Sequence, residues 1–234
     1  MVNKLNLGLI GAGRIGRVHA ESIYRIPNAQ IVGVADVFVE NAHQCAADFA
    51  IPAAHPDHRV LLDDPTIDAV VICSSTDTHP RLIVEAAEAG KHVFCEKPIA
   101  LNLAEIDRAL ATVERCGVKL QIGFNRRFDS NFRHLHEVVK RGEIGAPHLV
   151  RITSRDPAPP PISYVKVSGG IFLDMMIHDF DMVRYLVGAE VEELYAMGGV
   201  LVDPAIGEAG DVDTAVVSLK FSNGALGFIE NSRQ

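Results

Sequence analysis

The chain has 234 residues, a formal net charge of −8 and a hydrophobic fraction of 48%, a composition typical of a globular protein with a sizeable core. The negative charge repels phosphate backbones and anionic lipids, and no cluster of lysines and arginines interrupts it, which excludes nucleic acids and membrane surfaces as partners. No leader-like segment and no apolar stretch of membrane-spanning length is present, so we expect a cytoplasmic location.

The first half of the chain alternates short β-branched runs with segments of helix length. Helices are expected from about Arg14 and near residues 41–49, and strands at residues 5–10, 30–35, 68–73, 92–96 and 119–123. Strands separated by helices in this way indicate βαβ units and a parallel sheet. We therefore predict an α/β fold whose residues 1–123 form a doubly wound Rossmann domain.

The pattern changes after Asn125. Long helices are expected at residues 130–140 and 171–187, a strand at 148–154, and a stiff, proline-rich loop at 156–163. Three further strand-like runs follow without helices between them, and Asn223-Gly224 is typical of a hairpin turn. This order predicts an α+β domain over residues 124–234 with a mainly antiparallel open sheet.

The sequence G-A-G-R-I-G connects the first strand to the first helix and predicts a dinucleotide site. Gly11 makes the tight turn, Gly13 lets a pyrophosphate approach the backbone, and Gly16 lets helix and strand pack closely, with Arg14 and Ile15 between them. Asp36 ends the second strand, where an acid accepts hydrogen bonds from the ribose hydroxyls. An acid followed by Val37 favours NAD over NADP. A glycine turn without a nucleotide and a flavin site are the alternatives.

The predicted helix 171–187 is apolar over most of its surface but carries one polar stripe. At about 100° per residue, Asp174, His178, Asp181 and Tyr185 fall in a narrow sector. Burying such groups without partners is costly, so we expect the stripe to line a polar cavity. There His178 can accept a hydroxyl proton while Asp174 orients and stabilises the ring. A metal would need further ligands from elsewhere, and we expect none.

Two other features of the sequence concern its lysine and cysteine chemistry. Glu96-Lys97-Pro98 follows a predicted strand at the edge where open α/β sheets bind ligands, and Lys97 there can hold a reacting hydroxyl; the alternative is an exposed loop lysine. The cysteines lack C-x-x-C spacing, so we expect reduced, structural thiols at Cys45, Cys73, Cys95 and Cys116.

Taken together, these motifs resemble the Gfo/Idh/MocA family over the whole chain: GAGRIG, Asp36, CSSTDTHP, GKHVFCEKP, GFNRRFD and GGIFLDMMIHDFD occur in that order. RDPAPPPISYVKVSGG and the D-x-x-x-H-x-x-D helix are most similar to the bacterial members that oxidise inositol at C2. The resemblance implies Lys97, Asp174 and His178 as the catalytic group and Asp181 as a ligand of a substrate hydroxyl. It places Arg127 and the Arg155-Asp156 region beside the substrate, has Pro98 fix the direction of the lysine, and assigns to the cofactor Ser74, Thr76, His79 and Glu96.

The resemblance implies an NAD-dependent dehydrogenase that oxidises a secondary hydroxyl of a cyclic polyol, with myo-inositol as the foremost candidate. Oxidation of a glucose-type pyranose, reduction of a deoxy-keto sugar, and a non-catalytic NAD-binding regulator are the alternatives. Family members usually continue well beyond the position of Gln234, so we expect the second domain and its sheet to be incomplete here. The family's open sheet usually pairs between subunits, which implies a homodimer or homotetramer.

Overall fold

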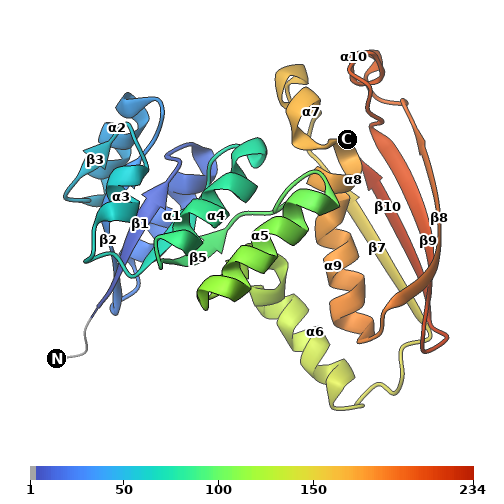
Figure 1. Ribbon diagram of the computed structural model, residues 1–234. Coiled ribbons are helices and arrows are strands. Elements are labelled where there is room, and N and C mark those ends of the chain that lie inside the picture. The colour runs from blue at the N-terminus through green and yellow to red at the C-terminus, as the bar shows by residue number, and fades with distance from the viewer. Residues whose placement is uncertain (1–3) are drawn as a thin grey trace. The chain divides into compact units, whose positions relative to one another are not determined.

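The computed structural model describes residues 4–234, which form two compact units that divide between Gly123 and Phe124 (Figure 1). Each unit has its own sheet and its own hydrophobic core. Among the described residues, no helix combines the length and the apolar character needed to span a membrane.

The first unit is built on a parallel sheet of six strands in the order β3-β2-β1-β4-β5-β6. The strands are β1 Leu5–Ile10, β2 Ala29–Ala35, β3 Ala54–His55, β4 Ala69–Ile72, β5 His92–Cys95 and β6 Leu120–Ile122. The helices between them are α1 Arg14–Tyr24, α2 Val39–Phe49, α3 Arg59–Asp63, α4 His79–Glu88 and α5 Leu103–Cys116, with a short 3-10 turn, η1, at Thr76–Thr78. The strand order reverses between β1 and β4, which is the switch point where open α/β sheets bind ligands.

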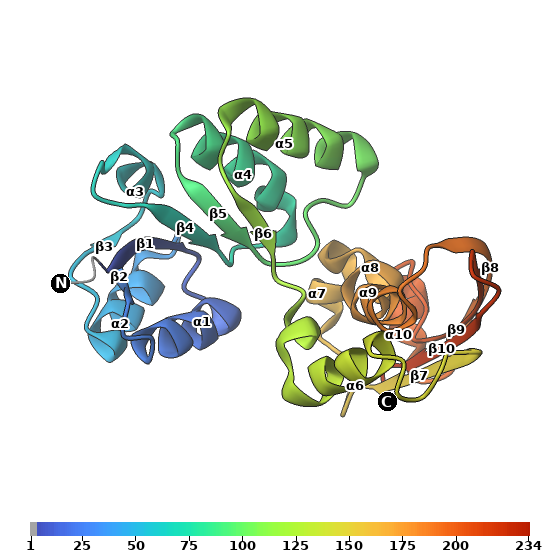
Figure 2. The same ribbon diagram turned by 90° about the horizontal axis from the view of Figure 1, so that it is seen from below.

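Helices cover both faces of this sheet, with α1 and α2 on one side and α4 and α5 on the other (Figure 2). Each side has its own cluster of buried apolar residues, which explains why the central strands read as nearly continuous apolar runs. The longest helix, α5, begins where the Asn102 side chain accepts a hydrogen bond from the backbone of Glu105, and ends at Gly117 with a positive φ. The predicted doubly wound parallel fold is confirmed.

The second unit packs helices against one face of a four-stranded sheet in the order β7-β10-β9-β8. Its strands are β7 Leu149–Arg155, β8 Val191–Gly199, β9 Thr214–Phe221 and β10 Leu226–Ser232. Its helices are η2 Asn125–Phe128, α6 Ser130–Lys140, α7 Ile162–Ser168, α8 Gly170–Asp174, α9 Met176–Val187 and α10 Pro204–Glu208. The pairs β10–β9 and β9–β8 are antiparallel and β10–β7 is parallel, so the sheet is mixed and mainly antiparallel, as predicted.

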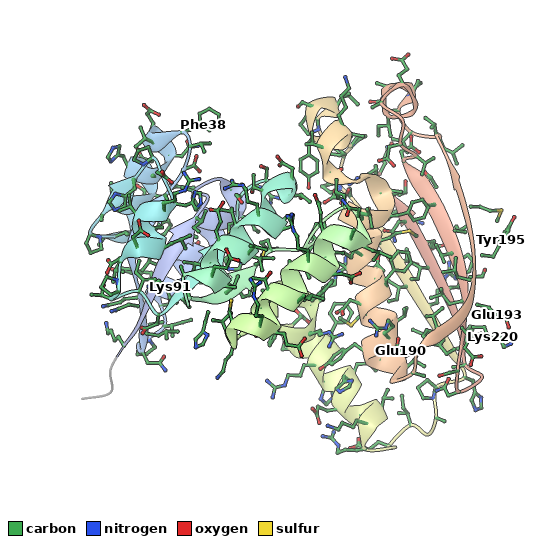
Figure 3. All side chains as sticks on the ribbon, viewed as in Figure 1. Phe38, Lys91, Glu190, Glu193, Tyr195 and Lys220 are labelled. Atoms are coloured by element: carbon green, nitrogen blue, oxygen red, sulfur yellow. The ribbon has the colours of Figure 1, made fainter. Side chains whose placement is uncertain are left out.

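Burial alternates along β9, which shows which face of the sheet packs against the helices. Ala215, Val217, Leu219 and Phe221 are buried in a core shared with α8 and α9, while the residues between them point away from the helices. Figure 3 shows Glu193, Tyr195 and Lys220 projecting from the outer side of β8 and β9.

Three segments of the second unit differ from the sequence prediction. The helix expected at 171–187 is interrupted at Met175, where the backbone N–H of His178 bonds to the carbonyl of Met175, three residues back. The helix α7 begins inside the predicted proline-rich loop, because a proline is compatible with the position before a first helical turn. The helix α10 lies between β8 and β9, where none was expected; the Asp203 side chain caps it and Pro204 occupies its first turn.

Candidate functional site

The glycine loop after β1 is fixed by close packing of the backbone. Gly11 has a φ of +94°, and a Cβ there would lie 2.7 Å from the backbone nitrogen of Ser74. A Cβ on Gly16 would lie 2.0 Å from the carbonyl oxygen of Gly11. Neither position can hold a side chain without separating β1, α1 and the end of β4.

Gly13 is different, because a Cβ there would meet no atom within 4 Å. The chain does not itself fill the space over this residue, which precedes the first turn of α1 and makes no side-chain cap. An open backbone position at a helix N-terminus is where a pyrophosphate binds, with free N–H groups and the helix dipole facing it. The loop therefore fits a dinucleotide.

A cavity of about 440 Å³ adjoins this loop at the carboxyl ends of β1, β2 and β4. Asp36 lies in it, and its two carboxylate oxygens accept hydrogen bonds from the backbone N–H groups of Ala12 (2.7 Å) and Phe38 (2.9 Å). An ionised carboxylate has about four lone-pair sites, so both oxygens can still accept ribose hydroxyls. The predicted role of Asp36 is therefore compatible with its geometry.

Two basic side chains, His58 and Arg81, also line this cavity, but both are paired with Glu85 at 2.5 and 2.8 Å. The charge of the Arg81 guanidinium is offset within the protein, and Val37 beside Asp36 is 85% exposed and uncharged. The cavity thus has no unpaired cation next to Asp36 among its lining residues, a surface that suits NAD better than NADP.

The residues predicted to bind the cofactor fall into two groups. The first group lines the cavity: Gly11, Gly13, Asp36 and Ser74. The second does not line it: Arg14, Ile15, Gly16, Thr76, His79, Glu96 and Lys97. Ser74 is held in place by a 2.6 Å hydrogen bond between its hydroxyl and that of Thr78.

His79 and Glu96 have protein partners that the sequence did not reveal. His79 is 1% exposed, and its ring nitrogens lie 2.8 Å from the carbonyl oxygen of Pro98 and 3.1 Å from that of Ser74. Glu96 accepts from His19 at 2.6 Å. The side chain of His79 thus contacts two backbone segments of the first unit, and its expected place at the cofactor stays a prediction.

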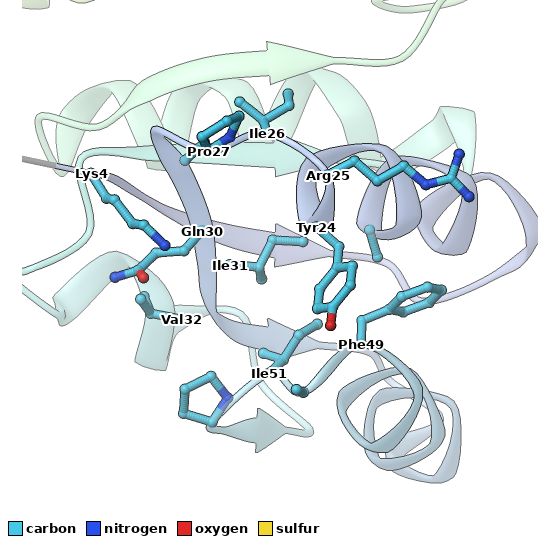
Figure 4. A pocket seen from close by; sticks show the side chains of 14 residues that line it. Lys4, Tyr24, Arg25, Ile26, Pro27, Gln30, Ile31, Val32, Phe49 and Ile51 are labelled. Carbon is cyan, nitrogen blue, oxygen red and sulfur yellow. The ribbon is translucent and has the colours of Figure 1, made fainter.

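A second cavity of about 320 Å³ lies at the opposite ends of the strands, between the ends of α1 and α2 and the start of β2 (Figure 4). Most of its lining residues are apolar, with Tyr24, Ile31 and Phe49 around it and Lys4 at one side. No residue predicted to belong to the site lines it. The predicted motif residues of the first unit that line a cavity therefore all line the larger one, at the glycine loop.

In the second unit, Asp174 is bound by two side chains from other elements. The Tyr164 hydroxyl donates to one carboxylate oxygen at 2.8 Å, and Arg233 donates to the other at 3.2 Å. Arg233 is 2% exposed and also bonds to Asp156 at 3.3 Å. A buried guanidinium beside two carboxylates keeps negative charge on Asp174 favourable, next to the helix that carries the half-buried His178.

Asp181, which the resemblance assigns to a substrate hydroxyl, is paired with Arg127 in the structure, and its role at the substrate stays a prediction. Arg127 donates from two nitrogens, with contacts of 2.6 to 3.1 Å to the two oxygens of Asp181, and this hydrogen bonding raises the pKa of Arg127. The guanidinium also lies 5.1 Å from the centre of the Tyr185 ring, which stacks on His136. The polar stripe is therefore satisfied mainly by protein partners on η2, α6 and α7 and by Arg233, which follows β10.

The sequence reasoning missed Asp179, the most deeply buried residue of the H-D-F-D segment at 0% exposure. It accepts hydrogen bonds from Arg126, from the Ser154 hydroxyl at 2.9 Å and from the Asn231 amide at 2.8 Å. One signal was available in the sequence: two adjacent arginines, Arg126 and Arg127, and two closely spaced aspartates, Asp179 and Asp181. In the structure these residues form two ion pairs that join η2 to α9.

The cysteines are free, and burial raises the pKa of Cys45, Cys73 and Cys95, which keeps these thiols protonated and unreactive. Within residues 4–234, no three histidine, cysteine or carboxylate side chains converge in a way that could hold a metal ion.

Comparison with known proteins yields two family models that together match most of the chain. Residues 5–124 match the model described as "Oxidoreductase family, NAD-binding Rossmann fold", and residues 132–234 match the "GFO/IDH/MocA C-terminal domain". The myo-inositol 2-dehydrogenase of Thermotoga maritima is 54% identical over 98% of this chain and 69% of its own length. The inositol 2-dehydrogenase of Rhizobium meliloti is 46% identical over the same two shares.

A solved structure gives the same result at the level of the fold. The scyllo-inositol dehydrogenase from Lactobacillus casei, crystallised with NAD(H) and scyllo-inositol, superposes with a TM-score of 0.89 at 31% identity. The match covers 99% of this chain and 71% of that one. The two curated relatives and this structure are all longer than the present chain.

Proposed function

The chain belongs to the Gfo/Idh/MocA family of oxidoreductases, and on that premise we propose that it is an NAD-dependent dehydrogenase of cyclic polyols. Its foremost substrate is myo-inositol, oxidised at C2 to 2-keto-myo-inositol (scyllo-inosose) with formation of NADH. The observation that carries the redox assignment is the open cavity over Gly13 beside Asp36. The substrate class rests on relatives named as inositol dehydrogenases.

The first unit binds the cofactor and the second provides the proton acceptor. NAD, when bound, supplies the hydride acceptor for the hydrogen on the reacting carbon. His178 takes the proton of the hydroxyl as the carbonyl forms, so that hydride and proton leave on separate acceptors. Asp174, with its charge favoured by Arg233 and Tyr164, stabilises the imidazolium that results. Lys97 holds the reacting oxygen through a charge-assisted hydrogen bond.

The arginine pairs define which acidic residues remain for the substrate. Asp181 is bound by Arg127 through both oxygens and so holds α9 against η2, and its remaining lone-pair sites can still accept a substrate hydroxyl. Asp156 has one contact with Arg233, and its side chain is about one-third exposed at 34%. Asp156 is therefore a further candidate for contact with a substrate hydroxyl.

scyllo-Inositol is the second candidate substrate, because the solved relative that contains it matches this chain over nearly its whole length. A glucose-type pyranose remains the alternative outside the inositols. A non-catalytic NAD-binding regulator would have no use for a proton acceptor with a charged partner, and the Arg233–Asp174 contact favours an enzyme.

The decisive experiment is NADH absorbance after mixing the purified chain with NAD and one polyol. We expect turnover with myo-inositol, and separate reactions contain scyllo-inositol, D-glucose, or NADP in place of NAD. His178→Ala should lower kcat by about 100-fold or more, the range for loss of a general base, with NAD affinity retained. The matched control is His134→Ala, an exposed histidine of α6. Undiminished turnover in His178→Ala would show that the base is wrongly assigned.

The proposal includes assembly as a homodimer or homotetramer through the outer face of the second sheet. That face carries several exposed apolar side chains, among them Leu149, Tyr195, Met197 and Leu226. Apolar residues gathered on one open sheet face are typical of an interface between subunits.

A further inference from the structure

His79 joins two segments of the first unit that the motifs assign to the site. It is the first residue of α4, and its ring is enclosed by the protein at 1% exposure. Nδ1 lies 2.8 Å from the carbonyl oxygen of Pro98, after β5, and Nε2 lies 3.1 Å from that of Ser74, after β4. One buried side chain thus contacts the backbone beyond the carboxyl ends of two neighbouring strands.

Each of the two contacts lies next to a group with a proposed role. Ser74 lines the cavity that fits the dinucleotide. Pro98 directly follows Lys97, and on the other side of Lys97 the carboxylate of Glu96 is held by His19 at 2.6 Å. Each neighbour of Lys97 is therefore bound to a histidine: the Glu96 carboxylate to His19 on α1, and the Pro98 carbonyl to His79 on α4.

The helix α4 is a firm base for these contacts. Leu82, Ile83 and Ala86 on this helix are at most 2% exposed and belong to the core beneath the sheet. The position of the His79 ring is consequently fixed by packing, and its two nitrogens fix the two carbonyls in turn. Small displacements of a reacting group reduce rates steeply, which makes such fixation effective.

We propose that His79 is a positioning residue for the dehydrogenase, acting on Lys97 through the Pro98 carbonyl and on the cofactor cavity through the Ser74 carbonyl. The proposed effect on Lys97 rests on the proposed function, whereas the proposed effect on the cofactor cavity requires only that the chain binds NAD. A histidine that merely fills the core would affect both properties together, in proportion to stability.

Two substitutions separate the contacts, because each replaces one ring nitrogen. In His79→Asn the amide nitrogen can occupy the place of Nδ1 and retain the bond to Pro98; in His79→Gln it can occupy the place of Nε2 and retain the bond to Ser74. We measure the NAD dissociation constant by titration calorimetry, kcat with the best polyol, and folding by circular dichroism. His43→Asn and His43→Gln are the matched controls, since His43 is exposed on α2.

We expect a crossed pattern. His79→Gln should lower kcat by about 10-fold or more, and by more than His79→Asn does, because Lys97 loses its fixed neighbour. His79→Asn should weaken NAD binding by about 5-fold, and by more than His79→Gln does, as expected for one lost hydrogen bond. Equal effects of the two variants on both quantities would overturn the proposal.

The wild-type protein provides a second test that needs no variant to fold. Nitrogen NMR on the ¹⁵N-histidine-labelled chain should show a ring N–H protected from exchange, since both His79 partners accept and at least one nitrogen must donate. Absence of any protected histidine ring N–H would overturn the proposal. If the wild type binds NAD but oxidises no polyol, the proposed function fails. The NAD affinities of the two variants would still test whether His79 acts on the cofactor cavity through Ser74.

Discussion

At the scale of single residues, the charged groups of the second unit are held by ion pairs whose members are far apart in the sequence. Three ion pairs connect separate parts of this unit: Arg126 with Asp179, Arg127 with Asp181, and Arg233 with Asp174. These pairs differ in burial, from fully enclosed Asp179 to Arg127, whose side chain is 40% exposed. Their contributions to stability should therefore differ as well.

Asp179→Ala should lower the free energy of unfolding by about 3 kcal/mol, because it leaves Arg126, Ser154 and Asn231 without their shared acceptor. Urea denaturation followed by circular dichroism measures the change. Asp181→Ala is the comparison: its partner Arg127 can turn to solvent, so we expect a cost nearer to about 1 kcal/mol. Equal losses in the two variants would contradict this ranking.

Some residues of the candidate site carry a signal in the sequence and others carry none, for a physical reason. The glycines of the loop and Asp36 act within one βαβ unit, so their spacing carries the information. Arg233 contacts Asp174 across 59 positions, and His79 contacts Pro98 across 19. Contacts of that kind depend on how elements pack, which neither periodicity nor a local motif encodes. The assigned roles of Lys97, Asp174 and His178 stay predictions.

At the scale of elements, helix and strand types were predictable along most of the chain, while interruptions were not. The period of apolar residues identified α6 at residues 130–140, in agreement with the structure. The interruption between α8 and α9 at Met175 could not be predicted, because the apolar residues continue through it without a change of spacing. The short helix α10 depends on a cap and one proline, too brief a signal to compete with the flanking strands.

The turn between β8 and α10 depends on one carboxylate, Asp213, and this gives a pH dependence. Burial alone would raise the pKa of Asp213, but hydrogen bonds from the backbone N–H groups of Leu201, Asp203 and Val202 outweigh it, so the pKa lies below its ordinary value. A carboxyl group with a lowered folded-state pKa stabilises the fold above its unfolded pKa of about 3.9, and this contribution is lost as the pH falls through the folded value.

Asp213→Asn should therefore lower Tm at pH 7 and have a smaller effect below the unfolded pKa of about 3.9, where the contribution of wild-type Asp213 is progressively lost. The amide retains one acceptor oxygen but presents N–H groups to the donors on the other side. Thermal melts from pH 3 to 7 measure the difference between the two proteins. A constant difference in Tm over this range would exclude Asp213 as a source of acid sensitivity.

At the scale of the whole molecule, the outer face of the second sheet is the surface that assembly would use. Cross-strand pairing puts Tyr195, Ser218 and Phe228 in one row, and Met197, Val216 and Glu230 in the next. Paired residues point to the same side of a sheet, and the opposite side is the one packed on α8 and α9. Ion pairs lie on the same face: Glu230, within the second row, is bound to Arg151, and Lys220 is bound to Glu193.

A sheet face that combines exposed apolar side chains with paired charges is compatible with a subunit interface, and its exposed apolar side chains favour association over a free monomer. We expect light scattering after size exclusion to give a dimer or tetramer for the wild type at micromolar concentration. Tyr195→Lys combined with Met197→Lys should shift the mass to that of the monomer, because two cations per subunit would be buried at a self-complementary contact. Tyr24→Lys, at a 69% exposed tyrosine of the first unit, controls for added charge and should leave the mass unchanged. If the double variant keeps the wild-type mass, the interface does not lie on this face.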